Sequence, residues 1–142
     1  MIKLSTKGRY GVRAMLELAK RHGNGPILMS TIAAEQEISR KYLHALLTSL
    51  KSSGLVNSSR GVRGGYSLSR EPSEIHINEI VEALEGPTAI VHCVDGNRSC
   101  PRASICAVKE LWEDVSHTIT QKLNNFTLAD LIIREQEIAA SS

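Results

Sequence analysis

The sequence predicts a mainly α-helical fold in which a helix-turn-helix is followed by a small β-hairpin and, further along the chain, by one long helix. Two observations predict it. Apolar residues recur at helical spacing over most of the 142 residues, whereas one glycine-rich segment alternates apolar and polar residues as a strand does. Apolar residues make up 42% of the chain, which is enough for the core of one domain with an extension.

Three helices are predicted in the first half. A first helix runs from about Thr6 to His22, and a short second one from about Ser30 to Glu37, with Ser30 or Thr31 as its N-cap. After a tight turn, Ser39 is expected to cap the third helix. The apolar face of the third helix is made of Leu43, Leu46, Leu47 and Leu50, and its polar face of Arg40, Lys41, His44, Thr48 and Lys51.

The segment from Leu55 to Ser69 has the pattern of a β-hairpin. Tyr66 and Leu68 alternate with serines, and glycines suit a flexible tip on which Arg60 and Arg63 stand. With the preceding helices, this hairpin completes a winged helix-turn-helix. In that fold the second helix of the motif fits the major groove of DNA, and the hairpin, called the wing, reaches the adjacent groove or the phosphates.

The charge distribution favours a polyanionic partner. Residues 1–70 carry twelve Lys or Arg against three acids, a balance of +9, whereas residues 71–142 have a balance of −7. A solvated basic face would give the same count, but the polar helix face and the wing lie in the same half and favour a double-stranded DNA operator as partner. The candidate DNA contacts from this pattern are Ser39, Arg40, Lys41, His44, Arg60 and Arg63.

The second half is predicted to contain a helix that stops at Gly86, a long helix from about Ala107 to Asn124, and a last helix capped by Thr127. The long helix has an apolar stripe that could pack two helices together, made of Val108, Leu111, Trp112, Val115, Ile119 and Leu123. We therefore expect a DNA-binding domain at 1–86, a cysteine-bearing loop at 87–106, and a dimerisation helix with a C-terminal helix at 107–142.

All three cysteines lie in one loop, "HCVDGNRSCPRASIC". The spacing of Cys93, Cys100 and Cys106 lacks the close pair that structural zinc sites use. Thiolates are soft ligands, and a loop of this reach can surround an iron–sulfur cluster, which we favour. A zinc site, a redox thiol switch and three buried cysteines are the alternatives, and the polar loop disfavours the last of these.

The sequence argues against several classes of protein. Basic residues interrupt the N-terminal segment, so it is not expected to be a signal peptide, and no apolar run is long enough to cross a bilayer, so a cytoplasmic protein is expected. No nucleophile–base constellation or phosphate loop indicates an enzyme. A regulator of the same fold that senses through thiols or a small molecule without a cluster stays open, as does a small electron carrier or cluster-delivery protein.

Several stretches carry a resemblance that covers nearly the whole chain: "LSTKGRYGVRAMLELA", "ISRKYLHALLTSLKSSGLVNSSRGVRGGYSLSR", "INEIVEALEGP", the cysteine loop and "LWEDVSHTITQKLNNFTLADL". On these stretches the chain resembles the IscR/NsrR-type family of winged-helix repressors. The resemblance implies a homodimer paired through the long helix, and a 2Fe–2S or 4Fe–4S cluster on Cys93, Cys100 and Cys106. It also implies a set of residues that face the DNA: Ser39, Lys41, Tyr42 and His44 in the major groove and Arg60 in the minor groove.

The fourth cluster ligand of that family does not carry over. The 2Fe–2S branch has a histidine three residues after its last cysteine, where this chain has Lys109. The 4Fe–4S branch has an acidic residue early in the first helix, where this chain has Arg9. His92, Asp95 and His117 are candidates from their position or chemistry, and the type of cluster stays open.

Overall fold

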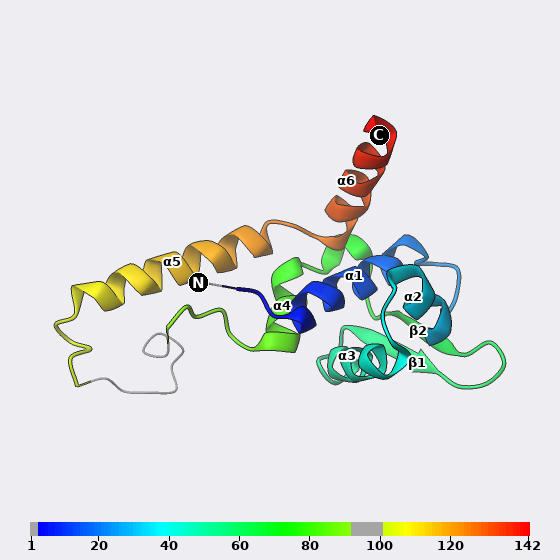
Figure 1. Cartoon of the computed structure of the whole chain (residues 1–142), viewed down its shortest axis with the longest axis horizontal. Coiled ribbons are helices and arrows are strands. Elements are labelled where there is room, and N and C mark those ends of the chain that lie inside the picture. Colours follow the sequence, from blue (N-terminus) through cyan, green and yellow to red (C-terminus); the bar gives the residue numbers. More distant parts are fainter. Residues whose placement is uncertain (1–2, 92–100) are drawn as a thin grey trace.

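The computed structural model describes residues 3–91 and 101–142. Its elements, in chain order, are α1 (Thr6–Lys20), α2 (Met29–Gln36), α3 (Arg40–Ser52), β1 (Val56–Ser59), β2 (Gly65–Leu68), the 3-10 helix η1 (Pro72–Glu74), α4 (Ile77–Glu85), α5 (Ala107–Asn124) and α6 (Leu128–Ser141). Residues 3–85 form a head, and α5 extends away from it on the side opposite the wing (Figure 1). The predicted mainly α-helical winged helix-turn-helix is confirmed.

The core of the head is aliphatic and lies where α1, α3 and α4 meet. Met15 of α1, Leu47 of α3 and Ile80 of α4 are completely buried, and Leu128 of α6 joins them. The four leucines predicted for the inner face of α3 are all at most 2% exposed. Their spacing puts them on one side of the helix, so the opposite side of α3 stays in solvent.

The start of α2 differs from the prediction. Its N-cap is Leu28, whose side chain forms no capping hydrogen bond. The Leu28 carbonyl accepts instead from the amides of Thr31 at 3.0 Å and Ile32 at 3.2 Å. The prediction of Ser30 or Thr31 as N-cap is therefore wrong. Ile32 is buried and Met29 packs against the core, so tertiary packing rather than a capping side chain sets where this short helix begins.

The wing is attached to the head at its base. β1 and β2 pair antiparallel, from Val56 opposite Leu68 to Ser59 opposite Gly65. Ile27, which precedes α2, exchanges two backbone hydrogen bonds with Tyr66, each 2.8 Å long. This close approach requires Gly65, because a Cβ there would lie 2.3 Å from the Ile27 carbonyl oxygen. The base of the wing is thereby held against the segment between α1 and α2.

An ion pair ties the chain leaving the wing to α4. Arg70 Nη2 lies 2.6 Å from Glu79 Oε1, and the His76 amide donates to Glu79 Oε2 at 2.9 Å. Burial by itself raises the pKa of Glu79. The hydrogen bonds from the His76 amide and Arg70, together with the charge of Arg70, outweigh burial and hold the pKa of Glu79 below its ordinary value of 4.5.

Glu79→Gln is expected to lower the free energy of unfolding at neutral pH by about 1 kcal/mol or less, because the pair is more than a third exposed and solvent screens it. A carboxyl group whose pKa is lowered by folding stabilises the protein above its unfolded-state pKa, and this stability is lost as the pH falls through the folded-state pKa. Urea unfolding across a pH series should therefore show the difference between protein and variant shrinking below about pH 4.5.

The control for this experiment is Glu137→Gln, which neutralises an exposed carboxylate paired with Arg134 at 3.1 Å on α6. We expect it to leave the free energy of unfolding nearly unchanged, as is usual for surface pairs. A Glu79→Gln difference that stays constant down to about pH 3 would contradict the role of the charge.

The C-terminal helices leave the head and return to it. His76 Nδ1 lies 2.7 Å from the Asn124 carbonyl oxygen at the end of α5. Thr127 caps α6 in a capping box with Asp130, as predicted for Thr127. Lys20 of α1 then pairs with Glu135 at 3.2 Å. As a result α6 packs against α1, while the N-terminal end of α5 lies far from the head (Figure 1).

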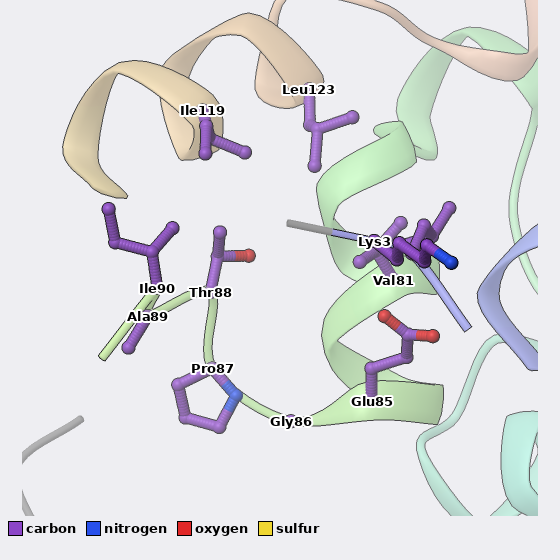
Figure 2. A pocket seen from close by; sticks show the side chains of 11 residues that line it. Lys3, Val81, Glu85, Gly86, Pro87, Thr88, Ala89, Ile90, Ile119 and Leu123 are labelled. Carbon is purple, nitrogen blue, oxygen red and sulfur yellow. The ribbon is translucent and has the colours of Figure 1, made fainter. Parts of the chain in front are cut away.

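The apolar stripe of α5 is only partly covered. An open cavity of about 720 Å³ lies between α4 and α5, with Val81 on one side and Ile119 and Leu123 on the other (Figure 2). Further along α5, Val108 and Leu111 are 55% and 52% exposed. The bounds predicted for this helix are those observed. None of the helices in the described ranges is long and apolar enough to cross a membrane.

Candidate nucleic-acid interface

The outer face of α3 is polar and open to solvent. Its exposed side chains include Arg40, Lys41, His44, Thr48 and Lys51, as predicted for this face. The helix contacts β1, so α3 and the wing lie side by side along one edge of the head (Figure 1). A helix of this kind is narrow enough to enter the major groove of DNA with its exposed face toward the base edges.

The start of α3 is fixed by a cap and a tyrosine. Ser39 Oγ accepts from the Tyr42 amide at 3.2 Å, which is the predicted N-cap. The Tyr42 side chain is half-buried, with its ring edge-on to Tyr10 at 6.0 Å between centroids, and its hydroxyl donates to Thr6 Oγ1 at 3.1 Å. Tyr42 thus contacts α1, whereas the neighbouring Ser39, Arg40 and Lys41 are exposed.

A polar network that sequence reasoning missed fixes the turn before α3. Arg13 donates to the Gln36 side chain at 2.9 Å and to the Gln36 carbonyl at 2.7 Å. Gln36 in turn donates to the buried carboxylate of Glu17 at 2.9 Å. The signal available in the sequence was the spacing of Arg13 and Glu17, one turn apart on α1. These bonds tie the end of α2, and hence the approach to α3, to α1.

The tip of the wing presents two arginines. Arg60 and Arg63 are exposed, and the amide of Gly64 donates to the Gly61 carbonyl at 3.0 Å to close the turn that carries them. Gly61 has a φ of +101°, which explains the need for glycine there. The structure therefore brings the two predicted wing arginines to one tip, beyond the end of the paired strands.

The basic residues of this edge are not neutralised within the described chain. Glu17 pairs with Lys20 at 2.6 Å, and Glu35 lies 3.6 Å from Arg21, so these acids face other cations. No ion pair with a described residue is formed by the exposed Arg40, Lys41, Lys51, Arg60 and Arg63. Unneutralised cations on a helix and a wing attract a polyanion such as DNA. When the polyanion binds, the counterions condensed on it are released.

Only one of the three predicted cluster cysteines, Cys106, lies among the described residues. Cys93 and Cys100 lie outside the described residues, as do His92 and Asp95. Cys106 is the N-cap residue of α5, is half-buried, and forms no disulfide with another described residue. His117 is exposed in the middle of α5, and Lys109 pairs with Glu113 at 3.1 Å. No group of metal-binding side chains gathers among the residues that the structure describes.

A winged helix-turn-helix whose exposed helix face and wing both carry cations that no described acid neutralises defines a DNA-binding transcription regulator. The chain belongs to the Rrf2 family: the model of that family, described as an iron-dependent transcriptional regulator, matches residues 4–134. The expectation that the protein is a regulator and not an enzyme is confirmed by this membership.

Curated relatives and solved structures agree with this assignment. Protein rrf2 of Nitratidesulfovibrio vulgaris is 38% identical over 131 residues, which are 92% of this chain and 87% of the relative. The regulator CymR of Bacillus subtilis is 40% identical over 130 residues, 92% of this chain and 89% of the relative. The structure of T. potens IscR is similar with a TM-score of 0.79 at 38% identity, over 96% of this chain and 90% of that one.

Proposed function

We propose that this protein is a homodimeric repressor that binds a double-stranded DNA operator, and that an iron–sulfur cluster on Cys93, Cys100 and Cys106 modulates this binding. The observation that carries operator binding is the set of exposed cations along α3 and the wing, which form no ion pair within residues 3–91 and 101–142. In this proposal α3 lies in the major groove, with Ser39, Arg40, Lys41 and His44 toward phosphates and base edges. Arg60 and Arg63 reach the adjacent minor groove or its phosphates.

The test of operator binding is the salt dependence of a single wing charge. Arg60→Ala is expected to weaken binding to a duplex selected by the full-length protein, and to reduce the slope of log K against log salt by about 1. Fluorescence anisotropy at several salt concentrations measures both. The control is Arg134→Ala, an exposed arginine of α6. An Arg60→Ala variant with the affinity and slope of the parent would contradict a role for the wing.

The homodimer is supported by the uncovered stripe of α5. Val108 and Leu111 are more than half exposed although both are large and apolar, and the stripe continues to Ile119 and Leu123 beside the open cavity. Apolar residues repeating by three and four are the pattern by which two helices pack. Two heads joined in this way can address major grooves one turn of DNA apart, about 34–36 Å.

The donor set fits a soft metal centre. Thiolates bind iron–sulfur clusters, and Cys106 is half-buried at the N-cap of the 18-residue helix α5. When bound, a cluster supplies a centre that oxidants or nitric oxide can alter. With three cysteines the fourth position is open, and neither Lys109 nor Arg9 is a suitable ligand for it.

The described residues that lead into the loop contact both the head and α5. At its start, Glu85 Oε1 accepts from the amides of Ser5 at 2.8 Å and Gly8 at 3.4 Å, which anchors the end of α4 to the start of α1. Further on, the Ile90 amide donates to Ser116 Oγ on α5 at 3.2 Å. In this proposal, binding of the cluster changes the angle between the head and α5, which these contacts join. Such a change affects transcription only if the two arrangements bind the operator with different affinity.

The test of the cluster is spectroscopic. Protein reconstituted with iron and sulfide without oxygen is expected to show visible absorption and a Mössbauer spectrum of a cluster. Replacing Cys93, Cys100 and Cys106 with alanine should abolish both while the far-UV circular dichroism is retained. A parent protein that stays colourless and free of iron would contradict the cluster, and would leave the cluster-free regulator that senses through thiols or a small molecule.

A further inference from the structure

The tip of the wing carries an apolar side chain between its two arginines. Val62 is fully exposed, and among the described residues it is the most exposed of the large apolar side chains. No core contact accounts for it. Burying such a side chain against a partner gains free energy in proportion to the apolar area removed from water, whereas exposing it gains none. Val62 is therefore available for contact with a partner that the wing meets.

The geometry of the wing holds Val62 in a defined place. The turn is closed by the hydrogen bond from Gly64 to Gly61, and Gly64 is packed so closely that a Cβ there would lie 2.5 Å from the Ser59 carbonyl oxygen. At the base, the bonds between Ile27 and Tyr66 hold the hairpin to the head. A tip fixed at both levels presents the fully exposed Val62 at the far end of the hairpin.

The flanking charges identify what Val62 faces. Arg60 and Arg63 are exposed on either side of it and form no ion pair with a described residue. Exposed arginines are attracted to the minor groove, where the negative potential of DNA is strongest. A wing whose arginines enter that groove brings the residue between them to the groove floor.

An apolar side chain on the floor of the minor groove can distinguish A·T from G·C pairs by the 2-amino group of guanine. A·T and T·A pairs present only acceptors there, whereas G·C pairs add the 2-amino donor of guanine. Valine cannot accept a hydrogen bond from that amine, and its branched side chain occupies the space of the water that would. We propose that Val62 is a specificity-determining residue that excludes guanine from the minor groove under the wing. The proposal rests on the operator binding proposed above.

The experiment uses the full-length protein and a duplex that it selects from a random pool. Single adenines are replaced by 2,6-diaminopurine, which adds only a minor-groove amine, and single guanines by inosine, which removes it. We expect one position per half-site at which an added amine weakens binding about tenfold, in the range usual for one unfavourable base pair. At that position an I·C pair should bind as tightly as an A·T pair, and a G·C pair about tenfold more weakly.

Variants separate Val62 from the arginines. Val62→Thr keeps the shape of the side chain but adds a hydroxyl that can accept a hydrogen bond from the amine. The ratio of the Kd for the G·C duplex to the Kd for the A·T duplex should therefore fall from tenfold to about twofold or less. Arg60→Ala should weaken binding to all the duplexes and keep the ratio. Ile138→Thr, which changes an exposed apolar residue of α6, should behave as the parent.

The outcomes decide between the two proposals. A parent that binds duplex DNA with steep salt dependence but tolerates the amine at every position would overturn the role of Val62 and leave operator binding intact. The role of Val62 is also overturned if Val62→Thr retains the full ratio, because groove width or the arginines would then account for it. A parent that selects no duplex overturns both.

Discussion

Leu111→Glu is expected to convert the protein into a monomer and to weaken its binding to an operator with two half-sites by about 10²- to 10⁴-fold. The leucine lies on the apolar stripe of α5 and is 52% exposed, so its replacement removes no core contact of the head. In the proposed dimer it packs against the partner's helix, where a buried carboxylate without a partner is strongly unfavourable. Loss of the dimer removes the linkage of two heads and thus the gain in effective concentration.

The measurements and control for this variant are direct. Analytical ultracentrifugation gives the mass, and anisotropy on duplexes with one or two half-sites gives the affinities. Affinity for a single half-site should stay within about twofold of the parent, because the head is unchanged. Gln121→Glu adds the same charge to an exposed position of α5 outside the apolar stripe and should remain dimeric. A Leu111→Glu protein that is still a dimer would place the interface elsewhere.

Local patterns predicted most of the elements. The bounds of α5, from Ala107 to Asn124, could be predicted because a polar cysteine loop and the NNF segment end the periodic pattern on both sides. The caps at Ser39 and Thr127 were predicted because their partners, the amides of Tyr42 and Asp130, lie three residues along the chain. Such signals are contained within one turn of helix, where sequence spacing fixes spatial distance.

Contacts between distant segments could not be predicted in the same way. The basic residues of the first half could be counted, but the count does not reveal that Arg13 is used to hold Gln36, 23 residues away. The pattern of α3 likewise did not show that Tyr42 would contact Thr6 and Tyr10. These bonds depend on how α1 crosses the motif, which local periodicity does not determine. They change the candidate site, because they separate residues that hold α3 in place from residues free to touch DNA.

Gly65→Ala is the second large effect that we expect, with a loss of about 3 kcal/mol in the free energy of unfolding, combining backbone strain and weakened hydrogen bonds. Gly65 has a φ of +144°, which side chains rarely adopt. Its Cβ would also lie 2.3 Å from the carbonyl oxygen of Ile27, which is backbone and cannot rotate away. To relieve the contact, β2 must separate from Ile27, and both hydrogen bonds of that bridge lengthen.

The matched control is Gly61→Ala, which isolates strain from collision. Gly61 also has a positive φ, +101°, but nothing lies within 4 Å of an added Cβ. Gly61→Ala should therefore lower the free energy of unfolding by about 1 kcal/mol, from backbone strain alone. Urea unfolding measures both, and equal losses in the two variants would contradict the collision. Because the Ile27 bridge also directs the wing, Gly65→Ala should bind the operator more weakly even under conditions where the variant is fully folded. The base of the wing would then be coupled to DNA binding through backbone geometry alone.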